Sequence, residues 1–388
     1  MTVLIINAGS TSLKCKLLQM PEERTLAKCR IERIGDGDKG IYAFSDKNGK
    51  ALSEKDIPIP TYADGLKRFL SDMAEIAEEA GAIERVGFKT VLSKGFSGVH
   101  VLTEDVLQGM RDSMTVAPAH NAPYLAVIEQ MQPLLPDALF VGAFETAFHQ
   151  TIPIERATYG VPFDWAERYG VRRMGYHGAS HEYSAAFVEK AQGATGRMVS
   201  CHLGGSGSLC AIEDGKSVDT TFGLSLQTGL IHSSRVGDMD AFVIPHLVKQ
   251  GLSMEEIESA LCKNGGLKGI SGVSGDLRDV YDAALRGNPR AALAVDVYIN
   301  GIVKWIGAFV AEMGGLDTLS FTGGIGENAF WLRKRVADSF AFLGLRLDDE
   351  RNAENPAVAL ISAENSAVRV YVIAADEEIV VARKTCSV

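Results

Sequence analysis

The sequence predicts an α/β protein built from two duplicated domains. Strand-like and helix-like segments alternate along the 388 residues, as is typical of the α/β class. A chain of this length exceeds what one hydrophobic core usually serves, so two domains are expected. A strand–turn–strand unit rich in glycine and serine also occurs twice, over residues 3–18 and 198–212. This internal echo indicates duplication, with chance similarity between two common hairpins as the alternative.

The first unit is a predicted β-hairpin. An apolar run enters a small polar turn over residues 7–12, and the second strand places Lys14 and Lys16 on the face opposite its apolar residues. Glycine lets a ligand approach the backbone, hydroxyl and N–H groups bond phosphate oxygens, and lysine supplies positive charge. The hairpin therefore predicts a polyphosphate site, with Asn7 able to reach a phosphate-bound metal. An ordinary amino-terminal hairpin is the alternative interpretation.

The rest of the first half continues the alternation. Short strands with turns are expected over 31–59, an amphipathic helix over 63–80 and a strand over 86–92. A loop over 117–122 then leads into a helix, and a buried strand follows over 139–144. A segment rich in proline and tyrosine, 152–169, is the predicted domain boundary.

The second half carries two glycine clusters. A helix over 182–192 precedes the second unit, in which strands 198–203 and 209–212 flank the turn 204–208. After a long helix over 291–313, a strand meets a glycine loop over 323–327, and a helix follows from 329. This order places helix N–H groups at an anion, as in nucleotide contacts. The loop lacks the G-x-G-x-x-G pattern, which disfavours a dinucleotide site. A last strand, 368–374, leads to a short helix.

Composition excludes several classes of function. The net charge of −10, with no basic tract, argues against binding to nucleic acid and to anionic membranes. The six cysteines show no zinc-binding spacing, and Cys201 and Cys210 are expected in the core. No apolar run is expected to reach membrane-spanning length, and no signal peptide is expected ahead of the first strand, so a cytoplasmic protein is predicted.

Taken together, these segments resemble the acetate kinase family, within the superfamily of sugar kinases, actin and heat-shock chaperone ATPases. The resemblance runs almost end to end. It is carried by the segments 6–14, 146–150, 175–181, 201–204, 215–220, 235–240, 272–279, 321–328 and 376–378. It implies two duplicated actin/sugar-kinase-like (ribonuclease H-like) domains around a cleft. Residues 1–148 plus 375–388 would form an amino-terminal kinase domain, and 149–374 a carboxy-terminal nucleotide-binding and dimerisation domain.

The same resemblance implies a site, residue by residue. It gives Mg²⁺ (or Mn²⁺) to Asn7 and Glu377, and the phosphate-side hairpin contacts to Ser10, Ser12 and Lys14. It implies ATP or ADP contacts at His202, Leu203, Gly204, Gly205, Ser206, Asp276, Leu277, Arg278, Gly323, Gly324, Ile325, Gly326 and Glu327. Catalytic roles fall to Glu145, His177 and Arg235, and contacts with the carboxylic acid to Lys89, Val91, Ala119, His120, Tyr176 and Leu226.

These residue types suit phosphoryl transfer to a carboxylate. The acceptor is already ionised at pH 7, so the site needs no strong base. It needs cations that bring two anions together and spread charge over an in-line transfer. Two alternatives remain open: Arg235 could pair with Asp238 at the surface, and His177 and His181, four residues apart, could bind a metal.

Departures from the family pattern cluster on the acid side. Lys89 stands where the family has an arginine, and a lysine lacks the planar fork of a guanidinium. Glu145 replaces an aspartate and reaches one methylene further. Ala119, Tyr176 and Leu226 replace leucine, phenylalanine and proline, Val91 is retained, and Gly205 replaces an asparagine. The hypothesis is that the protein uses ATP to phosphorylate a carboxylic acid and prefers one larger or more polar than acetate.

The resemblance also implies a homodimer that binds a small carboxylic acid and a nucleotide. Two alternatives stay open: a catalytically impaired nucleotide-binding paralogue with a regulatory role, and a kinase that uses another phosphoryl donor such as pyrophosphate. The apolar run 302–313 could contribute to a dimer interface or form an internal core helix.

Overall fold

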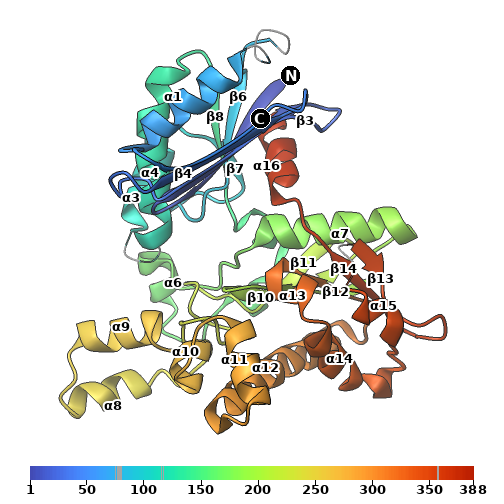
Figure 1. Cartoon of the computed structure of the whole chain (residues 1–388). Helices are drawn as coiled ribbons and strands as arrows, with labels where there is room; N and C mark the ends of the chain where they lie inside the picture. Colours follow the sequence, from blue (N-terminus) through green and yellow to red (C-terminus); the bar gives the residue numbers. More distant parts are fainter. Residues whose placement is uncertain (75, 77–80, 115, 117, 356–357) are drawn as a thin grey trace. The chain divides into compact units, whose positions relative to one another are not determined.

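The computed structural model describes residues 1–74, 76, 81–114, 116, 118–355 and 358–388, without the side chains of 118–120 (Figure 1). The chain forms two compact units. Unit 1 comprises Met1–Gln150 and Asp376–Val388, and unit 2 comprises Thr151–Ala375. Each unit contains one sheet with helices packed on it, so the predicted α/β class is confirmed.

The sheet of unit 1 has eight strands in the order β5-β4-β3-β2-β1-β6-β8-β7. β1 pairs antiparallel with β2 and parallel with β6, which in turn is parallel to β8. The predicted hairpin and the short strands that follow it are confirmed. The strands are β1 Thr2–Gly9, β2 Ser12–Gln19, β3 Arg24–Glu32, β4 Gly40–Asp46, β5 Ala51–Ile57, β6 Arg85–Phe88, β7 Val99–Val101 and β8 Leu139–Ala143.

The sheet of unit 2 has six strands in the order β11-β10-β9-β12-β14-β13. β9 pairs antiparallel with β10 and parallel with β12, which is parallel to β14. The strands are β9 Arg197–Leu203, β10 Gly207–Glu213, β11 Lys216–Thr220, β12 Thr318–Thr322, β13 Val358–Leu360 and β14 Arg369–Ile373.

The two sheets share one core topology. Strands β3-β2-β1-β6-β8 of unit 1 correspond in order and direction to β11-β10-β9-β12-β14 of unit 2. In both, an antiparallel meander of three strands is extended by two parallel strands. The glycine–serine turn joins the first two strands in each case, so the duplication predicted from the sequence is confirmed.

Helices cover both faces of the sheet in unit 1. Figure 1 shows α1, α3 and α4 on one side and the carboxy-terminal helix α16 on the other. Val3 and Ile5 of β1 pack against Ile379, Val381 and Ala382 of α16 in one buried cluster. These helices are α1 Tyr62–Asp72, α3 Glu104–Asp112, α4 Pro118–Met131 and α16 Glu377–Cys386, with short 3-10 turns at Gln132–Leu134 and Ala147–Thr151.

In unit 2, α7 Gly178–Gln192 and the long helix α12 Pro289–Met313 lie on opposite faces of the sheet (Figure 1). Val199, Cys201 and Leu203 of β9 belong to the same core cluster as α12. The other helices are α5 Ile154–Ala157, α6 Asp164–Tyr169, α8 Val243–Lys249, α9 Met254–Lys263, α10 Gly266–Ser271, α11 Leu277–Leu285, α13 Gly323–Asn328, α14 Phe330–Asp338 and α15 Asp349–Ala353, with a 3-10 turn at Ala341–Leu343.

Several predicted boundaries were wrong. Within the helix predicted over 63–80, α1 begins after a capping box at Thr61 and ends at Asp72. Residues 75 and 77–80 of that prediction lie outside the described residues. β6 ends at Phe88, short of the predicted 92. The loop predicted over 117–122 is helical from Pro118, a residue compatible with a first helical position. The glycine loop predicted over 323–327 is itself the short helix α13.

The expectation that no apolar run reaches membrane-spanning length was wrong. By length and composition alone, α12 is long and apolar enough to cross one. Nine of its side chains are nevertheless buried, and all nine belong to the core of unit 2. Burial of this face against the sheet accounts for the apolar composition of α12, which favours the core-helix interpretation over a dimer interface.

Candidate active site

In unit 1 the first hairpin presents its polar residues on a fixed turn. The strand register sets Asn7 of β1 directly opposite Lys14 of β2. The hydroxyl of Tyr62, at the start of α1, lies 2.6 Å from the carbonyl oxygen of Gly9 and 3.0 Å from that of Ser10. Lys14 and Ser10 are exposed, while Asn7 and Ser12 are half-buried. The turn is therefore anchored from behind, and its polar groups face outward.

Beside the hairpin, one lysine joins two acidic side chains. Lys89 follows β6, Glu145 follows β8, and Glu377 opens α16. The ammonium nitrogen of Lys89 lies 3.5 Å from Glu145 Oε1 and forms a hydrogen bond with Glu377 Oε2. Burial lowers the pKa of Lys89, but the charges of Glu145 and Glu377 outweigh this effect and raise it above its ordinary value. Lys89 is therefore a fixed cation at pH 7.

Two further contacts set this cluster in place. The Tyr124 hydroxyl, from α4, donates to Asn7 Oδ1 at 3.1 Å. The buried ammonium group of Lys16 lies 2.6 Å from Asp376 and 3.6 Å from Glu378, and Asp376 also accepts from the Ile379 N–H at the start of α16. These bonds tie the first turn of α16, and with it Glu377, to β2.

The donor set near Asn7 suits a hard cation. Mg²⁺ prefers oxygen ligands and is usually held by one or two carboxylates together with substrate phosphates and water. Asn7 offers an amide oxygen, and Glu377 and Glu145 offer carboxylates. No group of three or more His, Cys, Asp or Glu side chains with metal-site geometry occurs among the described residues, which leaves the His177–His181 metal alternative without support.

In unit 2, His177 stands at the start of α7 in an unusual backbone conformation. Its φ of 58° is left-handed, a region that non-glycine residues rarely occupy and that is often found at functional sites. This residue ends the preceding loop and lets the helix begin at Gly178, four residues before the predicted start. The imidazole of His177 contacts two neighbouring rings. Its centroid lies 4.2 Å from that of His202 and 5.2 Å from that of Phe222.

Arg235 is held by a backbone carbonyl. Its Nη1 donates to the carbonyl oxygen of Leu226 at 2.6 Å, while the carboxylate of Asp238 accepts from the Gly229 N–H. The predicted alternative of an Arg235–Asp238 surface pair therefore does not describe the arrangement. Burial lowers the pKa of Arg235 without discharging it, since guanidinium groups stay protonated in proteins.

The hydroxyl of Tyr176 is committed to the fold. It donates to the carbonyl oxygen of Leu224 at 2.6 Å, and the side chain is fully buried against Phe222. The hydrogen of this hydroxyl is thus directed at the backbone. Leu226 and, in unit 1, Val91 are buried apolar residues.

The two glycine clusters of unit 2 meet. Gly323 has a left-handed φ of 77°, and a Cβ atom at this position would lie only 2.7 Å from the Leu203 carbonyl oxygen. Any side chain here would therefore clash with that carbonyl group and separate the two turns. The Gly323 N–H donates to Glu327 Oε1 at 3.0 Å. Buried Arg333 fixes the far end of α13 by donating to the carbonyl oxygens of Gly326 and Glu327.

One polar atom in the second turn has no partner. The Ser206 hydroxyl is buried and forms no hydrogen bond with any described residue. Buried polar groups are normally bonded, so an orphan in a glycine turn needs an explanation. A phosphate oxygen is a suitable acceptor for it.

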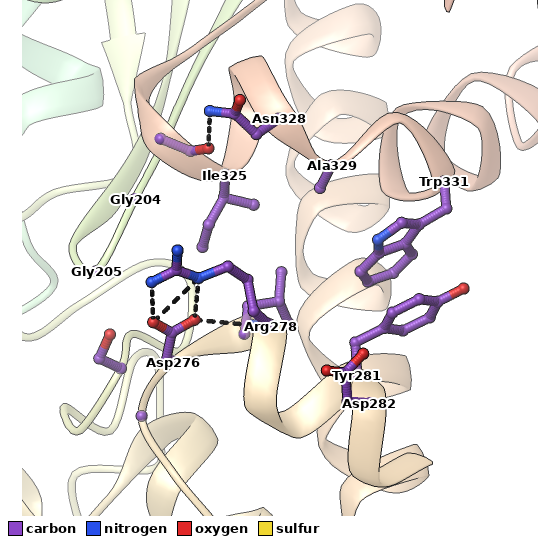
Figure 2. Close-up of a pocket in the computed structure, with 14 residues that line it drawn as sticks. Gly204, Gly205, Asp276, Arg278, Tyr281, Asp282, Ile325, Asn328, Ala329 and Trp331 are labelled. Atoms are coloured by element: carbon purple, nitrogen blue, oxygen red, sulfur yellow. Dashed lines mark hydrogen bonds and ion pairs between the residues drawn. The ribbon is translucent and has the colours of Figure 1, made fainter. Parts of the chain in front are cut away.

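These turns open on a cavity of about 660 Å³ (Figure 2). The volume lies in the usual range for small-molecule sites, roughly 300–1,000 Å³. One wall carries Gly204 and Gly205, another the start of α11, and a third α13. Asp276 caps α11 and forms an ion pair of 2.6 Å with Arg278. Tyr281 and Trp331 stack with ring centroids 3.7 Å apart at the other end.

The predicted residues thus fall into two groups, one in each unit. Unit 1 contains Asn7, Ser10, Ser12, Lys14, Lys89, Val91, Glu145 and Glu377. Ala119 and His120 lie in α4, but their side chains are outside the described part of the chain. The cavity of unit 2 takes in Gly204, Gly205, Asp276, Leu277, Arg278, Gly324 and Ile325, while Leu203, Ser206, Gly323, Gly326 and Glu327 belong to its turns.

Sequence reasoning missed several residues that complete these groups. Tyr62 anchors the hairpin and Tyr124 bonds Asn7. Tyr281 and Trp331 line the cavity, and Ser208 bonds His177. Only Ser208 carried a local signal, because it closes the glycine–serine turn. The aromatic residues lie in ordinary helical patterns and are recruited by tertiary packing.

Comparisons with known proteins agree along the whole chain. The model of the Acetokinase family matches residues 2–383. An acetate kinase from Shouchella clausii is 39% identical over 99% of this chain and 98% of its own length, and one from Bacillus subtilis is 37% identical over 98% of each. The crystal structure of Porphyromonas gingivalis acetate kinase aligns with a TM-score of 0.87 at 34% identity, over 100% of this chain and 99% of that one. A propionate kinase from Francisella tularensis aligns with a TM-score of 0.89 at 30% identity, with the same coverage.

Proposed function

The chain belongs to the acetokinase family, and we propose how its residues divide the reaction of that family. The protein is a phosphotransferase with a carboxyl group as acceptor, and it catalyses the ATP-dependent phosphorylation of a short-chain carboxylic acid. We propose a direct, reversible, in-line transfer of the phosphoryl group. The relatives are named for acetate or propionate, and they lend no support to a regulatory paralogue or to a pyrophosphate-dependent enzyme.

The cavity of unit 2 is the observation that carries the nucleotide assignment. In this proposal Asp276, Leu277 and Arg278 contact the adenosine, and the two glycine turns contact the phosphates. The orphan hydroxyl of Ser206 and the N–H groups of Gly324 and Ile325, at the start of α13, supply donors to phosphate oxygens. We also assign phosphate contacts to the hairpin residues Ser10, Ser12 and Lys14.

The acid and the transferring group are handled by fixed charges. The carboxylate acceptor is ionised at pH 7 and needs no base to become a nucleophile. In this proposal Lys89 contacts the carboxylic acid, while Arg235 and His177 contact the phosphoryl group, where charge must be spread in the transition state. The Leu226 carbonyl orients Arg235, and Glu145 orients Lys89 through their ion pair.

Mg²⁺ or Mn²⁺ would be held by Asn7 and Glu377. Such an ion would screen the charge of the nucleotide phosphates. Tyr124 keeps the amide oxygen of Asn7 in place, and the Lys16–Asp376 contact does the same for the turn that bears Glu377.

Three further properties belong to the proposal. Residues 1–148 plus 375–388 act as the kinase domain, and 149–374 act as the nucleotide-binding and dimerisation domain. The enzyme is a cytoplasmic homodimer; all six cysteines lie in the described part of the chain and none forms a disulfide, as expected in a reducing compartment. Light scattering of the purified protein at twice the mass of the 41.7 kDa chain is the expected result for a dimer.

A hydroxamate assay tests the reaction. The purified protein, ATP and Mg²⁺ are combined with acetate, propionate, butyrate, glycolate or lactate, and acyl phosphate is trapped. We expect turnover, with the highest kcat/KM for an acid larger or more polar than acetate. Arg235→Gln should abolish turnover, while the exposed Arg286→Gln serves as the matched control. Tight ATP binding without acyl phosphate from any acid would instead identify an impaired paralogue.

A further inference from the structure

Three histidines of unit 2 each bond a serine through Nδ1. His177 Nδ1 lies 2.9 Å from Ser208 Oγ, His181 Nδ1 lies 2.9 Å from Ser200 Oγ, and His202 Nδ1 lies 2.8 Å from Ser180 Oγ. Ser208 has a second contact, at 2.9 Å, with His181 Nε2. Four side chains therefore form one continuous chain of hydrogen bonds, Ser200–His181–Ser208–His177.

The periodicity of β9 and of α7, together with the register between β9 and β10, brings these four side chains together. Ser200 and His202 are two residues apart on β9 and so share one face, and Ser208 of β10 lies directly opposite His202. On α7, His181 lies four residues after His177, on the same side of the helix. Ser200, Ser208 and His181 are fully buried, whereas His177 is half-buried. The chain thus runs from the core of unit 2 to one imidazole that a ligand can reach.

Hydrogen-bond accounting distinguishes the two possible proton orders. Each neutral imidazole has one N–H and one acceptor nitrogen, and each hydroxyl has one hydrogen. In the first order, Ser200 donates to His181 Nδ1, His181 Nε2–H donates to Ser208, and Ser208 donates to His177 Nδ1. Every hydrogen of the buried groups then has an acceptor, and the remaining hydrogen of His177 is on Nε2.

The reverse order leaves a buried hydrogen unused. His177 Nδ1–H would donate to Ser208, Ser208 to His181 Nε2, and His181 Nδ1–H to Ser200. The Ser200 hydrogen would then need another acceptor, yet the bond to His181 is the only hydrogen bond of its side chain among the described residues. Leaving a buried donor unsatisfied costs about 1–3 kcal/mol.

We propose that Ser208, supported by His181 and Ser200, is a positioning residue that fixes His177 as the neutral tautomer with its hydrogen on Nε2. The tautomer of a histidine is set by the bond that its other nitrogen makes. An Nε2–H donor is what a phosphoryl oxygen requires, so the serine determines which atom His177 offers. This inference rests on the proposed contact between His177 and the phosphoryl group. Ring contacts with His202 and Phe222 hold the imidazole plane while Ser208 sets its proton.

Nitrogen NMR on the wild-type protein tests the tautomer without any substrate. With ¹⁵N-labelled histidine, long-range ¹H–¹⁵N spectra distinguish Nδ1–H from Nε2–H for each ring, and His177→Asn and His181→Asn assign the signals. We expect the Nε2–H form for both residues near neutral pH. An Nδ1–H signal for His177 would overturn the proposal, even if the enzyme phosphorylates acids. An Nε2–H signal without turnover on any acid would instead support the role of Ser208 and reject the assigned reaction.

Kinetics with matched serine variants test the consequence. Ser208→Ala should mix the His177 tautomers and lower kcat about tenfold or more, with little change in the KM for ATP. Ser208→Thr retains the hydroxyl and should restore both the Nε2–H signal and most of kcat. Ser184→Ala is the control, because Ser184 is equally buried on α7 and its hydroxyl bonds no described residue. An unchanged kcat and tautomer in Ser208→Ala would contradict the proposal.

Discussion

The ammonium nitrogen of Lys89 lies 3.5 Å from the Glu145 carboxylate and also bonds Glu377, so one cation balances two acidic side chains. The three residues come from the ends of β6 and β8 and from the start of α16. Glu145 is buried, and the side chain of Lys89 is 16% exposed. Removing the charge of Lys89 therefore leaves both carboxylates poorly compensated, whereas removing that of Glu145 leaves Lys89 paired with Glu377.

A double-mutant cycle measures this coupling. Lys89→Gln should lower the free energy of unfolding by about 3 kcal/mol, because it leaves two carboxylates without their cation. Glu145→Gln should be less damaging, since Glu377 still pairs with Lys89. In the double variant the losses should fall short of their sum by about 1–3 kcal/mol in urea unfolding at pH 7. Strictly additive losses would show that the pair does not interact.

The second prediction concerns the anchor of the first hairpin. Tyr62→Phe removes the hydroxyl that contacts the carbonyl oxygens of Gly9 and Ser10, and should cost about 1 kcal/mol of stability. Because the turn then loses its support, the KM for ATP should rise several-fold. Tyr42→Phe is the matched control, since its hydroxyl bonds Asp72 at 2.7 Å, away from the turn. A similar rise in KM for both variants would argue against a specific role of Tyr62.

Local signals explain what the sequence predicted well. The hairpin around Gly9 and the turn around Gly205 are encoded by adjacent residues, namely a strand period of two interrupted by glycine and serine. The shared order of the two sheets follows once these turns are recognised as equivalent. Helix α12 was also identified, because its apolar residues recur over many turns.

Long-range contacts explain what the sequence left open. Lys89 and Glu377 are 288 residues apart, and the Tyr124–Asn7 bond joins residues separated by 117. No local pattern encodes such pairs. The early start of α7 depends on the left-handed backbone of His177, which propensity does not favour. The place of Trp331 in the cavity likewise depends on its stack with Tyr281, a residue 50 positions earlier in the chain.

The third prediction is a loss of stability in acid caused by His232. Its Nδ1 accepts from the Gly207 N–H, and burial lowers the pKa of its imidazole to about 3, with help from the charge of Arg235. In the unfolded chain His232 has an ordinary pKa near 6.5, so it is protonated at pH values at which the folded protein keeps it neutral. Stability from this residue is thus complete above about pH 6.5 and declines as the pH falls toward 3.

Unfolding in urea at several pH values measures this effect. Between pH 7 and pH 4 the residue should account for a loss of about 3 kcal/mol, at roughly 1.4 kcal/mol per pH unit below 6.5. His232→Asn offers an acceptor in place of Nδ1 without a titrating group, so its profile should be flatter over this range. Parallel profiles for the wild type and the variant would assign the acid sensitivity to other groups.

The last prediction uses Trp331 as a reporter of the nucleotide. Of the three tryptophans, only Trp331 lines the cavity, where its ring stacks on Tyr281. ATP should therefore change the tryptophan fluorescence, and Trp331→Phe should remove that change while Trp305→Phe retains it. Trp331→Ala, which also removes the stacking partner of Tyr281, should weaken ATP binding about tenfold, or about 1.4 kcal/mol.

Because the Tyr281–Trp331 stack lies at the opposite end of the cavity from the phosphate turns, pyrophosphate should leave the fluorescence unchanged. A response of Trp331→Phe equal to that of the wild type would place the nucleotide outside this cavity.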